Sequence, residues 1–149
     1  TIDTTAILPV TERSSATPEP PSSPWEVAES FLDRLRRREI TSLGEILAAD
    51  VWLRALLPGD TREERGAAAV VATFRGWFER AAEITLVHSQ HHSLGTRELV
   101  GYRYRVRKQA GDSDLYLVEQ TGYCRVKDGR IRRLDVVCTG YHRVEPADT

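Results

Sequence analysis

Apolar residues recur with two different periods along this chain. Spacings of three and four residues, which indicate an amphipathic helix, follow Ser23 and appear again after Gly66. Alternation of apolar and polar residues, which indicates a half-buried strand, dominates after Glu83. Helices gathered around one early strand and followed by an unbroken series of strands are typical of α+β proteins. The pattern therefore predicts an α+β domain rather than an alternating α/β fold.

The first predicted helix has a complete N-terminal signature. Ser23 is a favourable N-cap, Pro24 suits the first helical position, and Glu26 completes a capping box. Arginines follow at the C-terminal end, where positive charge is favourable to the helix dipole, and they are interpreted as a solvated helix end. A short second helix is expected over about residues 43–47, and a third over about residues 67–80.

The strands are marked by apolar runs or by alternation. An early strand is predicted over residues 51–57, and the polar stretch 61–65 after it is interpreted as a link. In the strand that starts at Glu98, apolar residues alternate with arginines and one glycine, which is the pattern of a half-buried strand. The four later strands are expected over about residues 83–93, 98–108, 115–127 and 130–141.

The last two strands are joined at Asp128-Gly129, the strongest short hairpin signal in the chain. An uninterrupted register after this turn mixes charged and apolar residues on one face. One extra residue at Arg132-Arg133 removes the conflict, so we predict a β-bulge there. In that register Gln120 lies opposite Cys138, and Cys124 lies about 13 Å from Cys138 along the sheet. This separation is too long for a disulfide, so both thiols are expected to be free.

Composition and charge place the chain among globular proteins. Its 149 residues are 40% hydrophobic and 29% charged, with a formal net charge of −1. This charge gives no reason to expect a nucleic-acid or membrane partner, and no apolar run approaches the ~20 residues of a membrane span. The first residues lack the start of a signal peptide, so a cytoplasmic location is expected. We expect a domain over residues 24–145, between a flexible tail over 1–23 and a short tail over 146–149.

The order of the elements resembles that of SnoaL-like proteins in the nuclear transport factor 2-like superfamily. The resemblance spans Trp25 to Arg143 and includes the segment Leu47 to Leu53, Gly66 before the third helix, and the segment Val126 to Ile131. It implies a cone-shaped, cystatin-like α+β barrel in which three N-terminal helices pack on a curved, mostly antiparallel sheet around an apolar cavity. The superfamily includes ketosteroid isomerases, polyketide cyclases, epoxide hydrolases, dehydratases and binding modules, so the fold does not choose the function.

One departure from the family pattern affects the expected chemistry. Many enzymes of this group carry a carboxylate late on the first strand, just before a proline. Here Ala55 and Leu57 occupy the candidate positions ahead of Pro58, and neither side chain can transfer a proton. Asp50 lies too early, and Asp60 lies beyond the strand. The sequence therefore argues against the mechanism of ketosteroid isomerases.

Three side chains remain as candidate catalytic groups: His88, Tyr102 and Tyr104. His88 is near the apolar part of its strand and is either an acid or base near neutral pH, or a structural or surface histidine. The two tyrosines lie on an apolar face, where they either orient a ligand carbonyl or pack in the core. His92 shares a face with His88 but lies about 13 Å away along the strand, so no metal site is expected. No cofactor is expected either.

A further set of residues is expected to line a ligand pocket. Gln120 lies among apolar residues of the hairpin, where its amide needs a partner or a ligand. Arg54 is a candidate anchor for an anion or carbonyl if its face of the first strand lines the cavity, and the pattern leaves that question open. The predicted pocket residues are Trp52, Arg54, Phe74, Trp77, Gln120 and Cys138.

Two functions follow from these features. In the first, the protein binds a small, largely apolar molecule between helices and sheet and acts as a cyclase, isomerase or hydrolase of specialised metabolism. In the second, it is a non-catalytic dimeric module that binds a ligand or another protein. The charged outer sheet face is expected to form a homodimer interface, as in relatives. A closed core without a cavity of about 300 Å³ leaves only the interaction module. A cavity with His88 or Arg54 pointing into it favours the enzyme.

Overall fold

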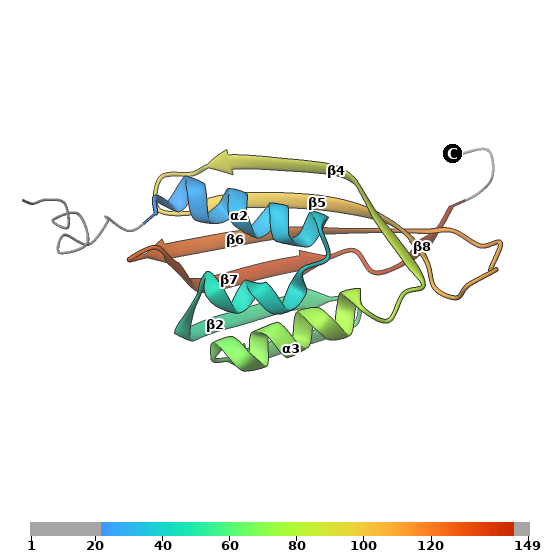
Figure 1. Cartoon of the computed structure of the whole chain (residues 1–149), viewed down its shortest axis with the longest axis horizontal. Coiled ribbons are helices and arrows are strands. Elements are labelled where there is room, and N and C mark those ends of the chain that lie inside the picture. The colour runs from blue at the N-terminus through green and yellow to red at the C-terminus, as the bar shows by residue number, and fades with distance from the viewer. Residues whose placement is uncertain (1–21, 145–149) are drawn as a thin grey trace, which may run out of the picture.

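Helices lie across one face of a single twisted sheet in the computed structural model, which describes residues 22–144 (Figure 1). The expected tails, apart from residues 22 and 23, lie outside the described residues. The helical segments are α2 (Pro24–Arg36), the 3-10 helix η2 (Ile40–Glu45) and α3 (Ala67–Phe78). The strands are β2 (Leu47–Leu57), β3 (Asp60–Arg65), β4 (Glu83–Ser93), β5 (Glu98–Arg107), β6 (Tyr116–Lys127), β7 (Arg130–Cys138) and β8 (His142–Arg143).

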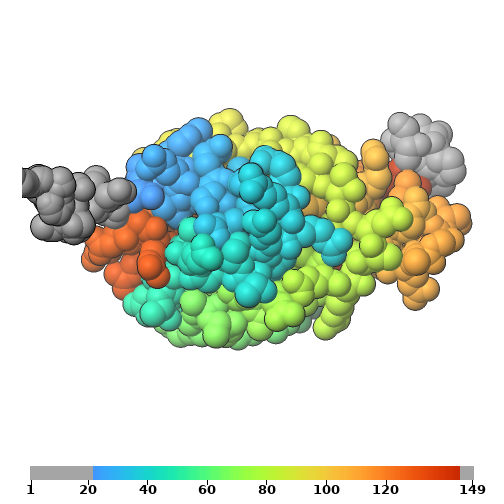
Figure 2. Space-filling view, viewed as in Figure 1, coloured from blue at the N-terminus to red at the C-terminus, as the bar shows by residue number. Residues whose placement is uncertain are grey.

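The sheet is mixed. Its strand order is β3-β2-β7-β6-β5-β4, with β8 paired to β6. β2 runs parallel to β7, and the other paired strands are antiparallel. Helices on one face of this sheet confirm the α+β class, and the space-filling view shows how they cover that inner face (Figure 2).

Three N-terminal helices were expected, and this detail is not confirmed. The second segment is a six-residue 3-10 helix, and α3 follows two strands instead of preceding the sheet. The 3-10 segment contains Thr41, Ser42 and Gly44, which are weak α-helix formers, and this composition favours a short, tight helix.

The stretch predicted as a polar link is strand β3. It pairs antiparallel with β2 after a turn at Pro58-Gly59, and its partners run from Leu57 opposite Asp60 to Trp52 opposite Arg65. The prediction was wrong because nearly every side chain of β3 is exposed, so the strand lacks the apolar alternation that indicates burial. Charged residues are usual on an edge strand, where they oppose pairing with other chains.

The first helix begins as its sequence predicts. The Ser23 hydroxyl accepts a hydrogen bond from the backbone N–H of Glu26 at 3.1 Å, and the Ser23 N–H donates to the Glu26 carboxylate at 2.9 Å. Both bonds of a capping box are therefore present.

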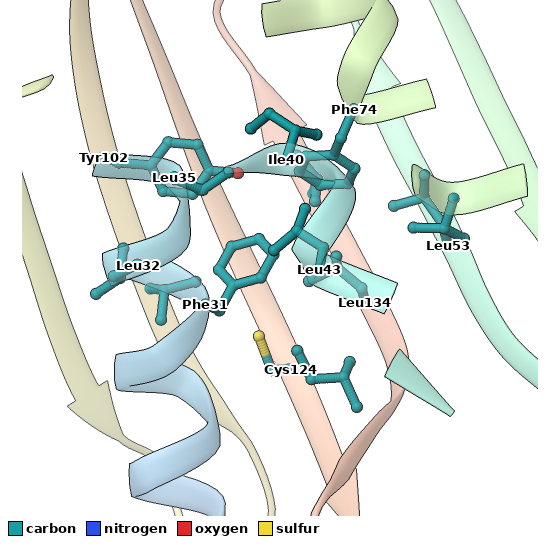
Figure 3. Close-up of a cluster of buried hydrophobic side chains, with 14 of the residues drawn as sticks. Phe31, Leu32, Leu35, Ile40, Leu43, Leu53, Phe74, Tyr102, Cys124 and Leu134 are labelled. Atoms are coloured by element: carbon teal, nitrogen blue, oxygen red, sulfur yellow. The ribbon is translucent and has the colours of Figure 1, made fainter. Parts of the chain in front are cut away.

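Aromatic side chains join the helices to the sheet in the core (Figure 3). Phe31 of α2 packs against Phe74 of α3 with ring centroids 5.8 Å apart, and against Tyr102 of β5 at 6.1 Å. Inward-facing residues of β2, Leu53 and Ala55, complete this core beside them. The open question about β2 is thereby answered: the face that carries Ala55 points inward.

The predicted bulge in the last hairpin is confirmed. Arg125 pairs with Arg133 and Val126 pairs with Ile131, so Arg132 is the extra residue. The predicted pairing of Gln120 with Cys138 follows from this register. Both cysteines are free, as expected.

Candidate functional site

An apolar cavity of about 210 Å³, here called the inner cavity, lies between the C-terminal end of α3 and the inner face of the sheet. A second hollow of about 310 Å³ adjoins it and shares two of its walls, Trp77 and Tyr141. The adjoining hollow has the volume of a small ligand site, about 300 Å³, and the inner cavity is smaller. The inner cavity is lined by Leu57, Pro58, Trp77, Phe78, Val118, Gln120, Cys138, Gly140 and Tyr141.

Local backbone geometry closes one side of the inner cavity. The segment after β7 passes Pro58 at Gly140, where a Cβ atom would lie 2.6 Å from the Pro58 ring. Gly140 also has a positive φ of 78°, which favours glycine. This close approach places Tyr141 against α3, where its hydroxyl lies 3.4 Å from the Trp77 carbonyl oxygen.

A buried hydrogen bond sets the polar chemistry of the inner cavity. The Tyr102 hydroxyl donates to the Gln120 side-chain carbonyl at 2.7 Å. This leaves the Gln120 amide nitrogen without a hydrogen-bond partner among residues 22–144, in a residue that lines the cavity. Burial raises the pKa of Tyr102, and the nearby Tyr104 adds a smaller increase. The Tyr102 hydroxyl therefore stays protonated and serves as a donor.

The other tyrosine is buried without a partner. The hydroxyl of Tyr104 forms no hydrogen bond within the described part of the chain. Burial raises the pKa of Tyr104, although the positive charges of Arg36 and Arg38 act in the opposite direction. Its ring packs 5.0 Å from that of Phe78, which lines the inner cavity.

His88 does not lie with the tyrosines. A bulge leaves Val87 unpaired in the β4–β5 ladder, so the alternation of β4 changes face after Leu86. As a result His88 pairs with Arg103 and is exposed on the outer face, whereas Tyr102 faces the core.

Trp52 and Arg54 also lie on the outer face, opposite the inner cavity. The outer face carries a groove of about 440 Å³ that includes Arg54, Leu56 and Val137 in its lining. Asp135 in this groove contacts Arg54 at 3.0 Å and Arg133 at 3.3 Å. Of the predicted pocket residues, Trp77, Gln120 and Cys138 line the inner cavity, while Phe74 is buried in the core beside Trp77.

A polar cluster around the buried side chains of His91 and Glu98, at the other end of β4, was not singled out by the sequence. His91 lies between two carboxylates, with Nδ1 2.6 Å from Glu29 and Nε2 2.8 Å from Glu98. The Ser93 hydroxyl donates to Glu98 at 2.6 Å, and the Trp25 ring stacks on His91 at 3.5 Å. The alternation of β5 gave one indication of this cluster, because Glu98 lies on the same face of the strand as the buried residues Val100 and Tyr102.

Residues 22–144 contain no group of three or more histidine, cysteine or acidic side chains placed to hold a metal ion. Within the same residues, no helix has the length and apolarity needed to cross a membrane.

Solved structures with this architecture come from several bacteria. One is a nuclear transport factor 2-like protein of unknown function from Burkholderia pseudomallei, at 21% identity and a TM-score of 0.60, covering 77% of this chain and 89% of that one. A proposed polyketide cyclase from Pseudomonas putida has 15% identity and a TM-score of 0.62, covering 77% of this chain and 90% of that one. An epoxide hydrolase from M. tuberculosis has 17% identity and a TM-score of 0.57, covering 76% of this chain and 80% of that one. At these identities the likeness shows the fold.

The sequence itself identifies the family. No curated protein matches the chain. The family model of the SnoaL-like domain matches residues 28–134, which include most of α2, all of α3 and the strands from β2 into β7. The chain therefore belongs to the SnoaL-like family of the nuclear transport factor 2-like superfamily.

Proposed function

We propose that the protein binds a small, largely apolar molecule in the inner cavity. The observation that carries this proposal is the position of Gln120. Its side chain is 4% exposed and lies among Val118, Phe78 and Cys138, with its amide nitrogen available to a ligand. A ligand carbonyl or hydroxyl in the cavity would accept a hydrogen bond from this amide. The apolar walls would bind the rest of the molecule.

The lining favours binding over proton transfer. Of the residues that line the inner cavity, none is a carboxylate or histidine, and the polar side chains are Gln120, Cys138 and Tyr141. Tyr102 lies behind Gln120 and supports its orientation through their hydrogen bond. These groups can orient a carbonyl, but an acid–base reaction needs a group that titrates near the working pH.

Catalysis by a cyclase, isomerase or hydrolase is the second candidate function. Its support is the fold shared with the polyketide cyclase and the epoxide hydrolase, together with the Tyr102–Gln120 hydrogen bond. In this version the Gln120 amide, held by Tyr102, would polarise a substrate carbonyl.

The test is to fill the inner cavity. The probe is methyl 2-naphthoate, which is neutral, flat and apolar apart from one ester carbonyl, and its binding is followed by titration calorimetry. Cys138→Phe places a ring in the cavity and is expected to lower the affinity at least about tenfold. Val87→Phe adds a ring at an exposed bulge and is expected to leave the affinity unchanged. Equal affinities for both variants would remove the proposal.

We also propose that two copies associate through the outer sheet face. Leu56 and Val137 line the outer groove and are 54% and 47% exposed. Arg54 and Asp135 lie beside them. A face that carries apolar residues and both signs of charge is suited to a two-fold interface, in which the same patch meets itself.

A further inference from the structure

The hollow beside the inner cavity carries positive charge without a compensating acid. Arg80, which follows α3, and Lys108, which follows β5, both line it, and no acidic residue does within the described chain. A backbone hydrogen bond from Ala82 to the Lys108 carbonyl, at 3.2 Å, joins the two segments. The two cations therefore come from neighbouring, connected parts of the fold.

Nearby acids are already paired with other arginines. Glu79 contacts Arg75 at 2.9 Å, and Glu83 contacts Arg107 at 3.6 Å. Within residues 22–144, Arg80 and Lys108 form no ion pair. This distribution leaves a local excess of positive charge at the hollow, which would attract a negatively charged group.

Lys108 lies against the ring of Tyr141, a residue that also lines the inner cavity. The Lys108 ammonium lies 4.8 Å from the centre of the Tyr141 ring and 4.3 Å from that of Tyr116, distances at which a cation is attracted to an aromatic face. Arg80 lines the same hollow as Tyr141.

The hollow and the inner cavity adjoin each other. Trp77 and Tyr141 belong to the lining of both. A molecule that packs its apolar body beside Phe78 and Val118 in the inner cavity can therefore extend a polar group past Tyr141 toward the cations.

We propose that the ligand is a small carboxylic acid, with its apolar body in the inner cavity and its carboxylate between Arg80 and Lys108. This inference rests on the proposed function and specifies its ligand class. A carboxylate fits better than a phosphate, because the other walls are Gly76, Ala81, Val106 and aromatic rings, which offer few donors for a third oxygen. The arginine fork can bind both carboxylate oxygens, and lysine adds a point charge.

The experiment compares two probes of similar shape, 2-naphthoate and its neutral methyl ester, by titration calorimetry at low salt. The wild-type protein is expected to bind the acid about tenfold more tightly than the ester, which corresponds to two weak, solvent-exposed ion pairs. Added salt is expected to weaken binding of the acid and leave binding of the ester nearly unchanged.

The decisive variant is Arg80→Gln combined with Lys108→Gln. It is expected to lower the affinity for 2-naphthoate about tenfold and to change that for the ester less than twofold. Arg105→Gln is the matched control, since Arg105 is exposed on β5 and forms no ion pair within residues 22–144. Both altered side chains are exposed, so the variant should fold, and its thermal midpoint checks this.

The outcomes separate the two proposals. If the ester binds but the double variant leaves the affinity for 2-naphthoate unchanged, the carboxylate site is wrong and the apolar cavity stands. If the double variant weakens both probes equally, the charge has no specific role and the carboxylate site is again wrong. If neither probe binds the wild-type protein, the proposed function fails and this inference fails with it.

Discussion

His91 shows how single residues join the helical layer to the sheet. A neutral imidazole has one N–H, yet both ring nitrogens of His91 lie within 2.8 Å of carboxylate oxygens, from Glu29 and Glu98. A ring nitrogen that carries a proton donates to the carboxylate beside it. Glu98 is 3% exposed, and it also accepts a bond from Ser93. The cluster therefore links α2 to β4 and β5, through a buried contact between His91 and Glu98 and an exposed one between His91 and Glu29.

Replacing His91 by alanine is expected to destabilise the protein by about 2 to 3 kcal/mol, because the buried Glu98 carboxylate then loses a hydrogen-bond partner. The free energy of unfolding, from urea denaturation, measures this. His88→Ala is the control, and its exposed side chain predicts a change below about 0.5 kcal/mol. Similar losses of unfolding free energy for the two variants would mean that the contacts of His91 do not stabilise the protein.

For the strands, the alternation of apolar and polar residues predicts pairing and register better than the charge of a segment does. The bulge in the last hairpin follows from the sequence because only one register separates apolar from charged residues, and the structure has that register. The bulge at Val87 gives no such signal, since polar residues lie on both sides of β4 beyond it. The charged strand β3 escaped prediction for a related reason: its pairing uses the backbone, and its side chains remain in water.

Deleting Arg132 tests the role of the bulge. The deletion forces an uninterrupted register, which turns either the residues near the turn or those beyond it, such as Leu134, away from the core. We expect loss of cooperative unfolding, followed by circular dichroism. Arg132→Ala keeps the bulge and removes only an exposed contact with Asp50, so it should cost less than about 1 kcal/mol. A deletion variant as stable as Arg132→Ala would contradict this account.

At the scale of the whole molecule, the two faces of the sheet have different properties. The inner face supplies Gln120 and Cys138 to the inner cavity, and the outer face supplies Leu56 and Val137 to a groove. The sequence located Gln120 and Cys138 because both depend on one hairpin. It did not indicate Tyr141, whose position depends on where the chain crosses Pro58 after β7. Contacts of that kind arise only from tertiary packing.

The outer face leads to a prediction about assembly. Sedimentation velocity is expected to show a dimer for the wild-type protein and a monomer for Leu56→Asp combined with Val137→Asp, because buried, unpaired carboxylates would oppose association. Val87→Asp is the control, since Val87 is exposed away from the groove, and it should remain dimeric. A wild-type monomer at every concentration would contradict the proposed interface.

Intermolecular nuclear Overhauser effects test whether a small apolar molecule binds in the inner cavity, because they locate the bound molecule. With methyl 2-naphthoate bound, the ring protons of the probe are expected to show contacts to the methyl groups of Val118 and the ring of Trp77, which line the inner cavity. Contacts confined to Leu56 and Val137 would place the molecule in the outer groove and contradict the account.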